Sequence, residues 1–383
     1  MSIYLDYNAS APIDERVLEV MINVYKNAYG NADSRTHDYG DSARKIVEDA
    51  RRHVANLLGV DKGEVFFTSG STESNNIAIR GLQKYAKESG KRHIITSAIE
   101  HKSVLEIVKS LQKEGFEVDL IDPEEDGRIG ANKLIGRVRE DTLLVSLMHA
   151  NNETGVIQPV KEIGEVLAGK GVLFHVDATQ SCGKLVPELK DIKYNMLSLS
   201  AHKLSGPQGV GALILRKKRY KLPPVKAIMY GGRQEHGIRP GTIPVALVAG
   251  LGKACELADV EYRNNIKAYE ESKDIVMRLI KESGLVYRIN GIQEYCMPNT
   301  INISLNGMES EALMLSAKQY CAISNGSACT SHDYSPSYVL AAMGLDEDRI
   351  SSAIRISWGA KTDKDELAEQ VGKLIEVAKG LVF

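Results

Sequence analysis

Two residues near the middle of the chain have side chains that could act together in covalent chemistry. Lys203 follows an alternating apolar stretch at 195–200 and precedes a Gly/Pro turn, whereas Asp177 ends the strand-like stretch 172–177. A lysine at this position is usually a surface residue, because burying its charge is costly unless the group is paired or used. A lysine that can form a Schiff base, together with a carboxylate that can hold a protonated pyridine nitrogen, is what pyridoxal phosphate requires. The pair therefore predicts a site for this cofactor.

A second candidate site is the turn at 69–76, which follows the apolar stretch 65–68 and opens a helix that we expect to reach about Ser89. Ser71 and Thr72 supply hydroxyls, and free backbone N–H groups at a helix start attract anions. The alternative is a simple helix cap with Glu73 at the third position. The turn lacks the Gly-Lys-Ser/Thr of a P-loop, and no Gly-x-Gly-x-x-Gly dinucleotide motif occurs.

Cys329 differs from the other cysteines of the chain. Its neighbours at 326–333 are small and polar, with no apolar pattern to bury the thiol, so it is a candidate nucleophile on a loop. The others are expected to be small buried hydrophobic residues: Cys182, Cys255, Cys296 and Cys321. An odd number of scattered cysteines without a Cys-x-x-Cys pair argues for a reducing cytoplasm and against disulfides or a zinc finger.

The elements that must position these groups alternate between strands and helices up to Leu215. This βα alternation predicts an α/β fold with a mostly parallel sheet between helices, and a ligand site at the carboxyl ends of its strands. Strands are expected at 3–7, 65–68, 93–97, 116–121, 143–149, 172–177, 196–200 and 210–215. Helices are expected after Asp14, before Gly59, and at 103–114 and 160–169. The candidate residues at the strand ends are Ser71, Thr72, His101, Asn152, Asp177, Gln180 and Lys203.

After Leu215 the pattern changes. A glycine-rich polar loop at 230–242 leads into a helix opened by Pro244, and a second, long charged helix is expected at about 262–282. Strands at 286–290, 300–305 and 353–358, with helices at 309–320 and 363–379, indicate a smaller α+β C-terminal domain with a mainly antiparallel sheet. We expect a large domain at 14–258 and a small domain made of 1–13 and 259–383, with a mobile cysteine loop at 322–336.

Composition excludes several classes of function. The chain has 383 residues, 43% hydrophobic and 26% charged, with a formal net charge of −2. This balance gives no electrostatic reason to expect direct contact with nucleic acid or an anionic membrane. The start lacks the pattern of a signal peptide, and the apolar runs are of strand length. We therefore expect a cytoplasmic protein without a membrane span.

Taken together, the motifs resemble those of the cysteine desulfurases of the nitrogen-fixation and iron–sulfur-assembly type. The resemblance covers about residues 3–380 and rests on YLDYN at 4–8, TSGSTES at 68–74, EH at 100–101, NNETG at 151–155, HVDATQ at 175–180, SAHK at 200–203, RPGT at 239–242, GSAC at 326–329 and RIS at 355–357. It implies fold-type I of the pyridoxal phosphate enzymes, with a seven-stranded sheet in the large domain, and a homodimer.

The resemblance also implies a role for each matching residue. Lys203 would bind the cofactor and move the substrate Cα proton, and His101 would stack on the ring and shuttle a proton to or from sulfur. Asp177 would pair with the pyridinium nitrogen and Gln180 with the phenolic oxygen. Arg355 and Asn152 would hold the substrate carboxylate. The phosphate would be bound by Ser71, Thr72, Ser200 and His202, with Thr242 reaching in from the other subunit.

In this family Cys329 would take sulfur from L-cysteine, leaving a persulfide on itself and releasing alanine. Acceptor proteins would receive the sulfur for iron–sulfur assembly or for thiolation of tRNA, cofactors or DNA, a choice that the sequence leaves open. Ser324, Asn325 and Gly326 are the expected hinge of the cysteine loop. Cys329 could also be a transient iron–sulfur ligand shared with a partner, although no nearby cysteines complete a site.

Two other functions remain as alternatives. A selenocysteine lyase or another pyridoxal-phosphate β-eliminating enzyme would use the same fold but would need no mobile thiol. A non-catalytic scaffold of a sulfur-transfer complex would be expected to have lost Lys203, Asp177 or Cys329, and all three are present.

Overall fold

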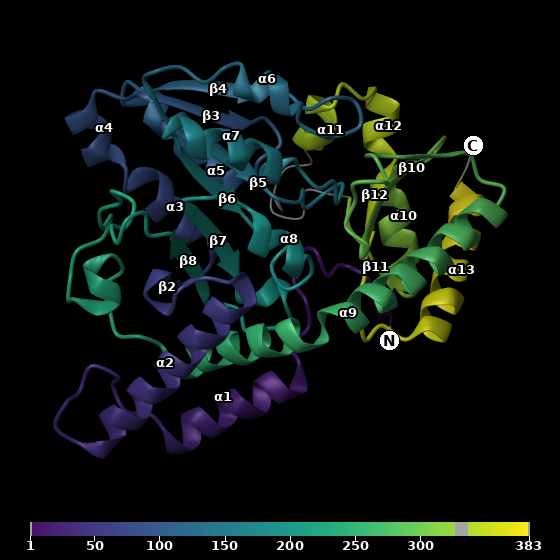
Figure 1. Ribbon diagram of the computed structural model, residues 1–383. Helices are drawn as coiled ribbons and strands as arrows, with labels where there is room; N and C mark the ends of the chain where they lie inside the picture. The colour runs from purple at the N-terminus through teal and green to yellow at the C-terminus, as the bar shows by residue number, and fades with distance from the viewer. Residues whose placement is uncertain (1, 326–335, 382–383) are drawn as a thin grey trace.

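A seven-stranded sheet forms the centre of the larger part of the molecule in the computed structural model, which describes residues 2–325 and 336–381 (Figure 1). The strand order is β2-β8-β7-β6-β5-β3-β4. The strands are β2 (Val65–Thr68), β3 (His93–Ser97), β4 (Glu117–Ile121), β5 (Thr142–Met148), β6 (Leu173–Asp177), β7 (Met196–Ser200) and β8 (Gly211–Leu215). β8 runs antiparallel to both of its neighbours, and the remaining pairings are parallel. The predicted mostly parallel sheet is confirmed.

Both faces of this sheet are covered by helices, which explains why nearly every residue of its strands is buried, apart from those of the edge strand β4. Adjacent residues of β2 point to opposite faces: Phe66 packs in one cluster with Ile77 and Val108, and Phe67 in another with Phe174. The helices on this part of the chain are α1 (Glu15–Asn27), α2 (Asp38–Leu58), α3 (Ser71–Arg80), α4 (Gln83–Ser89), α5 (Lys102–Lys113), α6 (Ala131–Ile135), α7 (Val160–Lys170) and α8 (Val186–Asp191). Short 3₁₀ helices lie at η1 (Lys62–Glu64), η2 (Ala201–Lys203) and η3 (Gln234–Gly237).

The helix ends follow their local sequence. Asp14 caps α1 by accepting from the backbone N–H of Arg16, and Gly59 ends α2 with a left-handed φ of 65°, which glycine adopts without strain. These two predicted boundaries are confirmed.

A second, smaller core lies around an antiparallel sheet of order β12-β10-β9. Its strands are β9 (Tyr287–Ile289), β10 (Thr300–Leu305) and β12 (Ala353–Ser357), and its helices are α10 (Ser310–Ala317) and α13 (Lys364–Leu381). Between them in sequence, α11 (Tyr338–Ala342) and α12 (Glu347–Ser351) pack against the larger core instead, through Val339, Leu340 and Ile350. The N-terminal strand β1 (Ile3–Tyr4) pairs in parallel with β11 (Cys321–Ala322), and Leu5 is buried in this smaller core. The N-terminal residues thus pack with the C-terminal part of the chain. The domain boundaries at 13/14 and 258/259 stay a prediction.

Two expectations about helices were wrong. The two helices expected on either side of residue 260 are one 38-residue helix, α9 (Val245–Glu282), because no Gly or Pro between Cys255 and Tyr262 interrupts it. Conversely, the single helix expected up to Ser89 is broken between α3 and α4 at Gly81. The Gly81 carbonyl accepts from the N–H of Lys226. A Cβ at position 81 would lie only 2.7 Å from the Lys226 carbonyl oxygen, so this close approach of two backbones explains why residue 81 is a glycine.

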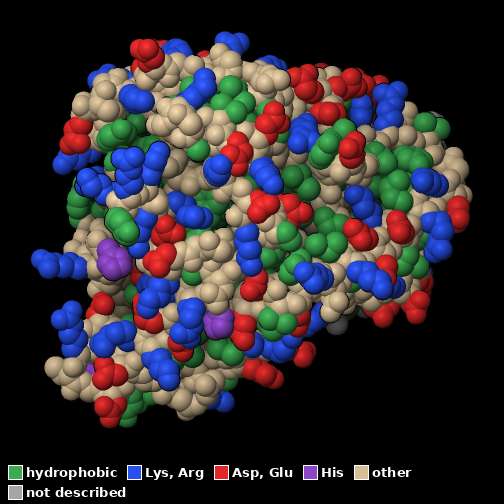
Figure 2. Space-filling view, in the orientation of Figure 1, with side chains coloured by type: hydrophobic (Ala, Val, Ile, Leu, Met, Phe, Trp, Pro, Cys, Tyr) green, Lys and Arg blue, Asp and Glu red, His purple; other side chains and the backbone are tan. Residues whose placement is uncertain are grey.

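The molecular surface carries both signs of charge. On the face shown in Figure 2, Lys and Arg side chains alternate with Asp and Glu, in line with the net charge of −2. Within residues 2–325 and 336–381, every helix is too short or too polar to cross a membrane.

Candidate active site

A cavity of about 280 Å³ lies at the carboxyl ends of the parallel strands, where the sequence predicted the ligand site. It is lined by Asn8, Ala9, Ser71, Thr72, His101, Met148, Ala150, Asn152, Asp177, Thr179, Gln180, His202, Lys203 and Arg355. Most predicted site residues therefore meet at one place. Ser200 lines an adjoining groove, whereas Thr242 is exposed and is not part of the cavity wall within this chain. Cys329 lies outside the described residues.

Lys203 ends the 3₁₀ turn that follows β7, which directs its side chain toward the N-terminal segment. Its Nζ donates to the carbonyl oxygens of Asn8 and Ala9, at 2.6 Å each. The Asn8 carbonyl also accepts from Nε2 of Gln180, at 2.9 Å. One backbone oxygen thus holds both the amine and the amide at the cavity.

Asp177 is a buried carboxylate at the end of β6. Its oxygens accept from Nδ2 of Asn75 at 2.8 Å, from the N–H of Thr179 at 3.0 Å and from the Thr179 hydroxyl. All three donors are neutral. The neighbouring His175 is buried between two serine hydroxyls, and burial lowers its pKa to about 4, so it adds no positive charge at neutral pH. The negative charge of Asp177 is therefore available to a cationic group in the cavity.

His101 caps α5 and is connected to Asp177 through side chains. Its Nδ1 accepts from the backbone N–H of Ser103 at 3.1 Å and lies 2.8 Å from the Ser103 hydroxyl. That hydroxyl accepts from the same Asn75 amide that donates to Asp177. Burial lowers the pKa of His101, with Asp177 opposing the shift. A neutral ring whose Nδ1 accepts must carry its proton on Nε2.

The turn before α3 forms the polar end of the site. Gly70 is the N-cap residue, makes no side-chain hydrogen bond to the helix and has a φ of 151°, which favours glycine. Ser71 and Thr72 begin the helix, and the adjoining groove of about 290 Å³ also includes Ser200 and His202. Burial, Lys203 and Lys184 lower the pKa of His202 to about 4. Hydroxyls and a helix N-terminus in one groove suit an anion such as phosphate.

Several buried polar atoms around the cavity lack a hydrogen-bond partner within the described residues. They are Oε1 of Gln180, Oδ1 of Asn152, Oδ1 of Asn75 and Nε of Arg355. Unsatisfied buried groups are costly, and their concentration at a cavity indicates that a polar ligand completes the site.

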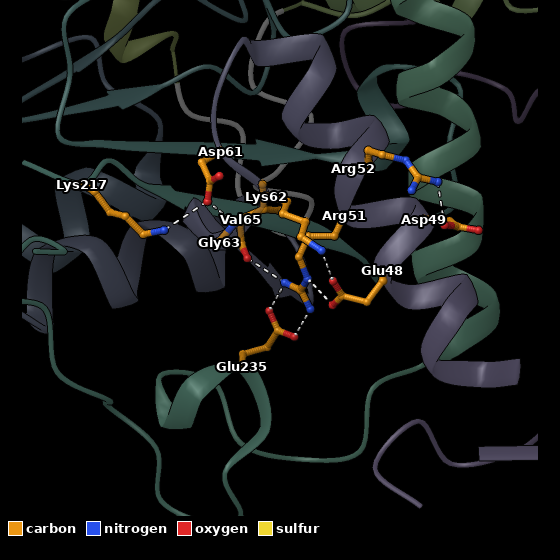
Figure 3. Close-up of polar contacts among 10 residues, drawn as sticks. All are labelled: Glu48, Asp49, Arg51, Arg52, Asp61, Lys62, Gly63, Val65, Lys217 and Glu235. Carbon is orange, nitrogen blue, oxygen red and sulfur yellow. Dashed lines mark hydrogen bonds and ion pairs between the residues drawn. The ribbon is translucent and has the colours of Figure 1, made fainter. Parts of the chain in front are cut away.

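The glycine-rich segment 230–242 is fixed to helix α2 by a buried ion pair (Figure 3). The guanidinium of Arg51 binds both carboxylate oxygens of Glu235, at 2.7 and 2.9 Å, and the same carboxylate accepts from the N–H of Phe67 at 2.7 Å. Glu235 has a φ of 46°, a strained value for a residue other than glycine. Further along, Arg239 donates to Glu73 on the first turn of α3 at 3.0 Å. The segment that ends in Thr242 is therefore tied to the anion-binding turn.

The segments on either side of 326–335 are bound to residues of the site. Ser324 and Arg355 exchange backbone hydrogen bonds, with Arg355 N donating to the Ser324 carbonyl at 2.5 Å. On the C-terminal side, the Ser337 hydroxyl donates to Glu153 at 2.5 Å, and the Tyr338 hydroxyl donates to the carbonyl of Glu100 at 2.7 Å. These acceptors directly adjoin Asn152 and His101 in sequence.

The four described cysteines behave as expected from their sequence context. Cys182, Cys255 and Cys321 are buried and Cys296 is partly buried, and burial raises the pKa of each thiol, to about 12 for Cys182 and Cys321. Such thiols are poor nucleophiles at neutral pH. Among the residues that the structure describes, no cluster of His, Cys, Asp or Glu could hold a metal ion.

Sequence reasoning missed two contributors to the site. Asn75 connects Asp177 with Ser103, and it lies on the inner face of α3, within a motif that was noted for its hydroxyls. Asn8 acts through its backbone carbonyl, which no side-chain pattern can indicate.

Known proteins are similar to this chain in both sequence and fold. The aminotransferase class-V family matches residues 3–369. The cysteine desulfurase IscS of Histophilus somni (strain 2336) is 42% identical over 384 residues, covering 100% of this chain and 94% of the relative. A solved NifS-like protein superimposes with a TM-score of 0.91 at 36% identity, covering 100% of both chains. A structure of SspA in complex with cysteine has a TM-score of 0.82 at 34% identity, covering 94% of this chain and 99% of that one. The chain belongs to the class-V aminotransferase family and, within it, to the pyridoxal-phosphate-dependent cysteine desulfurases.

Proposed function

We propose that this protein is an L-cysteine desulfurase in which Lys203, His101 and Cys329 carry out the chemistry. The carbon–sulfur bond of L-cysteine would break as the thiolate of Cys329 takes the sulfur atom. The electron pair of that bond would remain on the substrate carbon, which gains a proton to give L-alanine. Cys329 would be left as a persulfide. The observation that carries the proposal is the meeting of Lys203, Asp177 and His101 at one cavity.

The residues of the cavity fit pyridoxal phosphate. The uncapped start of α3, with the hydroxyls of Ser71, Thr72 and Ser200, suits the phosphate group. The buried carboxylate of Asp177, held by neutral donors, suits a protonated ring nitrogen. When bound, the cofactor would supply an electron-withdrawing ring that stabilises negative charge on the substrate carbon.

The side chains of the chain would then move protons at defined atoms. The Lys203 amine would accept and return the proton at the substrate Cα, while Nε2 of His101 would exchange a proton with the substrate sulfur. Gln180 has a second amide N–H beyond the one bound to Asn8, and this N–H would face the phenolic oxygen.

The substrate carboxylate would be held by Arg355 and Asn152. Both residues line the cavity: Nε of Arg355 is a buried donor without a partner among the described residues, and the side-chain amide of Asn152 would donate through Nδ2. A planar guanidinium is well suited to a carboxylate because it can donate two parallel hydrogen bonds.

We also propose the assembly and surroundings in which the enzyme works. The exposed position of Thr242, on a segment tied to Glu73 and Arg51, supports a homodimer in which this residue reaches the phosphate site of the second subunit. Sulfur-acceptor proteins would take the persulfide from Cys329, and an iron–sulfur cluster shared with such a partner would be cargo. Free cysteines support a reducing cytoplasm.

The test compares the protein with its Lys203→Ala and Cys329→Ala variants. With pyridoxal phosphate, L-cysteine and a thiol acceptor, we expect the unaltered protein to release alanine and sulfide. Lys203→Ala should lose the covalent cofactor band and the activity, whereas Cys329→Ala should keep the band and lose the activity. Near-normal cysteine turnover by Cys329→Ala would contradict the proposal and would favour a β-eliminating enzyme.

A further inference from the structure

Lys184 is a buried amine outside the wall of the active-site cavity, and together with Lys203 it borders a second cavity of about 380 Å³. It is 6% exposed, on the turn between Gln180 and α8. Its Nζ donates to the carbonyl oxygen of Gln180 at 3.0 Å and to that of Lys203 at 2.9 Å. Burying an ammonium group costs free energy, so a lysine with both bonds directed at two site residues calls for an explanation beyond packing.

The two residues that Lys184 holds by their backbones also meet through their side chains. Nζ of Lys203 and Nε2 of Gln180 donate to the same carbonyl of Asn8, at 2.6 and 2.9 Å. Gln180 and Lys203 come from the ends of two adjacent strands, β6 and β7. Gln180 and Lys203 are therefore linked in two ways: their backbone carbonyls both bind Lys184, and their side chains both bind the carbonyl of Asn8.

We propose that Lys184 is a positioning residue that fixes the Lys203 amine relative to the Gln180 amide by holding both backbone carbonyls. The proposal rests on the proposed function, because it assigns Lys203 and Gln180 to one cofactor. A reaction of an amine with a bound aldehyde requires close and well-oriented atoms, and small displacements slow it strongly. The two hydrogen bonds from Lys184 hold the backbone of Gln180 and of Lys203, and they would therefore limit displacement of both side chains.

The charge of Lys184 agrees with this role. Burial, together with the nearby Lys203, lowers the pKa of Lys184 to about 8, while Cys182 opposes the shift. At neutral pH most of the amine is still protonated, so its bonds to the two carbonyls are charge-assisted and stronger than neutral ones.

The test measures how fast the full-length chain, freed of cofactor, forms its covalent adduct with added pyridoxal 5′-phosphate. The adduct is followed by absorbance and, after borohydride reduction, by the mass of the peptide that contains Lys203. We expect Lys184→Met to slow adduct formation at Lys203 by roughly tenfold or more. Lys184→Arg, which keeps the charge and the donors, should recover part of the rate. Lys190→Met, which removes an exposed lysine of α8 paired with Asp259, is the matched control and should leave the rate unchanged.

The outcomes separate the inference from the function on which it rests. If the unaltered chain forms no adduct at Lys203, the proposed function fails. If it forms the adduct and Lys184→Met forms it equally fast, the positioning role alone is overturned. Should Lys184→Met fail to fold, as judged by circular dichroism, Lys184→Gln replaces it, because its polar side chain is one bond shorter and uncharged and so loses the charge-assisted bridge to both carbonyls. A rate equal to that of the unaltered chain would then overturn the role.

Discussion

The guanidinium of Arg355 is held by a carboxylate of the chain itself: its Nη2 lies 2.5 Å from Oδ1 of Asp6. Nη1 donates to the carbonyl of Asn152 at 2.8 Å, while the backbone of Arg355 pairs with Ser324. One residue of β12 thus joins the N-terminal segment, a turn of the cavity and the segment that leads toward Cys329. Asp6 fixes the plane of the guanidinium, which prepares it for a second carboxylate.

Replacing Arg355 with Lys should weaken substrate binding while leaving the cofactor in place. Lysine has a point charge and no planar fork, so we expect the KM for L-cysteine to rise roughly ten- to a hundredfold. Steady-state kinetics and the cofactor absorbance of the variant check both parts. Arg288→Lys, at an exposed residue of β9, is the control. An unchanged KM in Arg355→Lys would show that another group binds the substrate carboxylate.

Replacing Asp177 with Asn should separate cofactor binding from catalysis. An amide of similar shape can keep some contacts with Asn75 and Thr179, but it cannot stabilise a protonated ring nitrogen. We therefore expect the covalent cofactor band to persist while kcat falls on the order of a hundredfold or more. Single-turnover measurements with L-cysteine test this, and a variant with nearly full kcat would rule out an ion pair at the ring nitrogen.

The buried ion pair between Arg51 and Glu235 should contribute strongly to the free energy of unfolding (Figure 3). The exposed ion pair between Arg52 and Asp49 should contribute little. Arg51→Met leaves the buried carboxylate of Glu235 without its cation, a change that typically costs about 3–5 kcal/mol. Arg52→Met removes an exposed pair with Asp49 one residue along the same helix, and it should cost less than about 1 kcal/mol. Urea unfolding of both variants measures the difference. Equal, small losses would mean that Glu235 is satisfied without Arg51.

Stability should depend on pH through groups buried in their neutral form. Burial lowers the pKa of His149 and of His175 to about 4, below the ordinary value of about 6.5. Because unfolding lets them bind protons in this window, their contribution is present above about pH 6.5 and is lost as the pH falls toward 4. Burial raises the pKa of Glu100 to about 8, so its contribution has the opposite sign and is lost as the pH rises from about 4.5 to 8.

The sum of these groups places the stability maximum near pH 6.5. Calorimetric melting temperatures across roughly pH 4–8 test this. In His149→Gln the acid-side decline should become shallower, whatever the change in absolute stability. The same slope in both proteins would exclude His149 as a source of the decline.

The fold could be predicted largely from local pattern, because the strands of the large sheet are short, apolar and bounded by polar turns. The two wrong helix boundaries lie where the local sequence pattern does not show whether a helix continues. Nothing in the sequence around Gly81 shows that Lys226 approaches its backbone from 145 residues away. The polar residues near 260, such as Asp259 and Glu261, are compatible with one continuous helix and with a break between two.

The sequence predicted those residues of the site whose side chains have recognisable chemistry. Lys203, Asp177 and His101 stand at strand ends, where βα folds collect their ligands, and the structure brings them to one cavity. The supporting contacts could not be predicted in the same way. Asn8 contributes a carbonyl, and Lys184 is a lysine whose importance depends on two long-range backbone acceptors.

The most direct test of the account is the mass of the peptide that contains Cys329 after the holoenzyme reacts with L-cysteine without an acceptor. We predict a gain of one sulfur atom on this peptide and release of one alanine per persulfide formed. The described cysteines Cys182, Cys255, Cys296 and Cys321 should keep their masses, because their thiols are buried and protonated. Alanine and sulfide released while Cys329 stays unmodified, or sulfur found on another cysteine instead, would contradict the assignment.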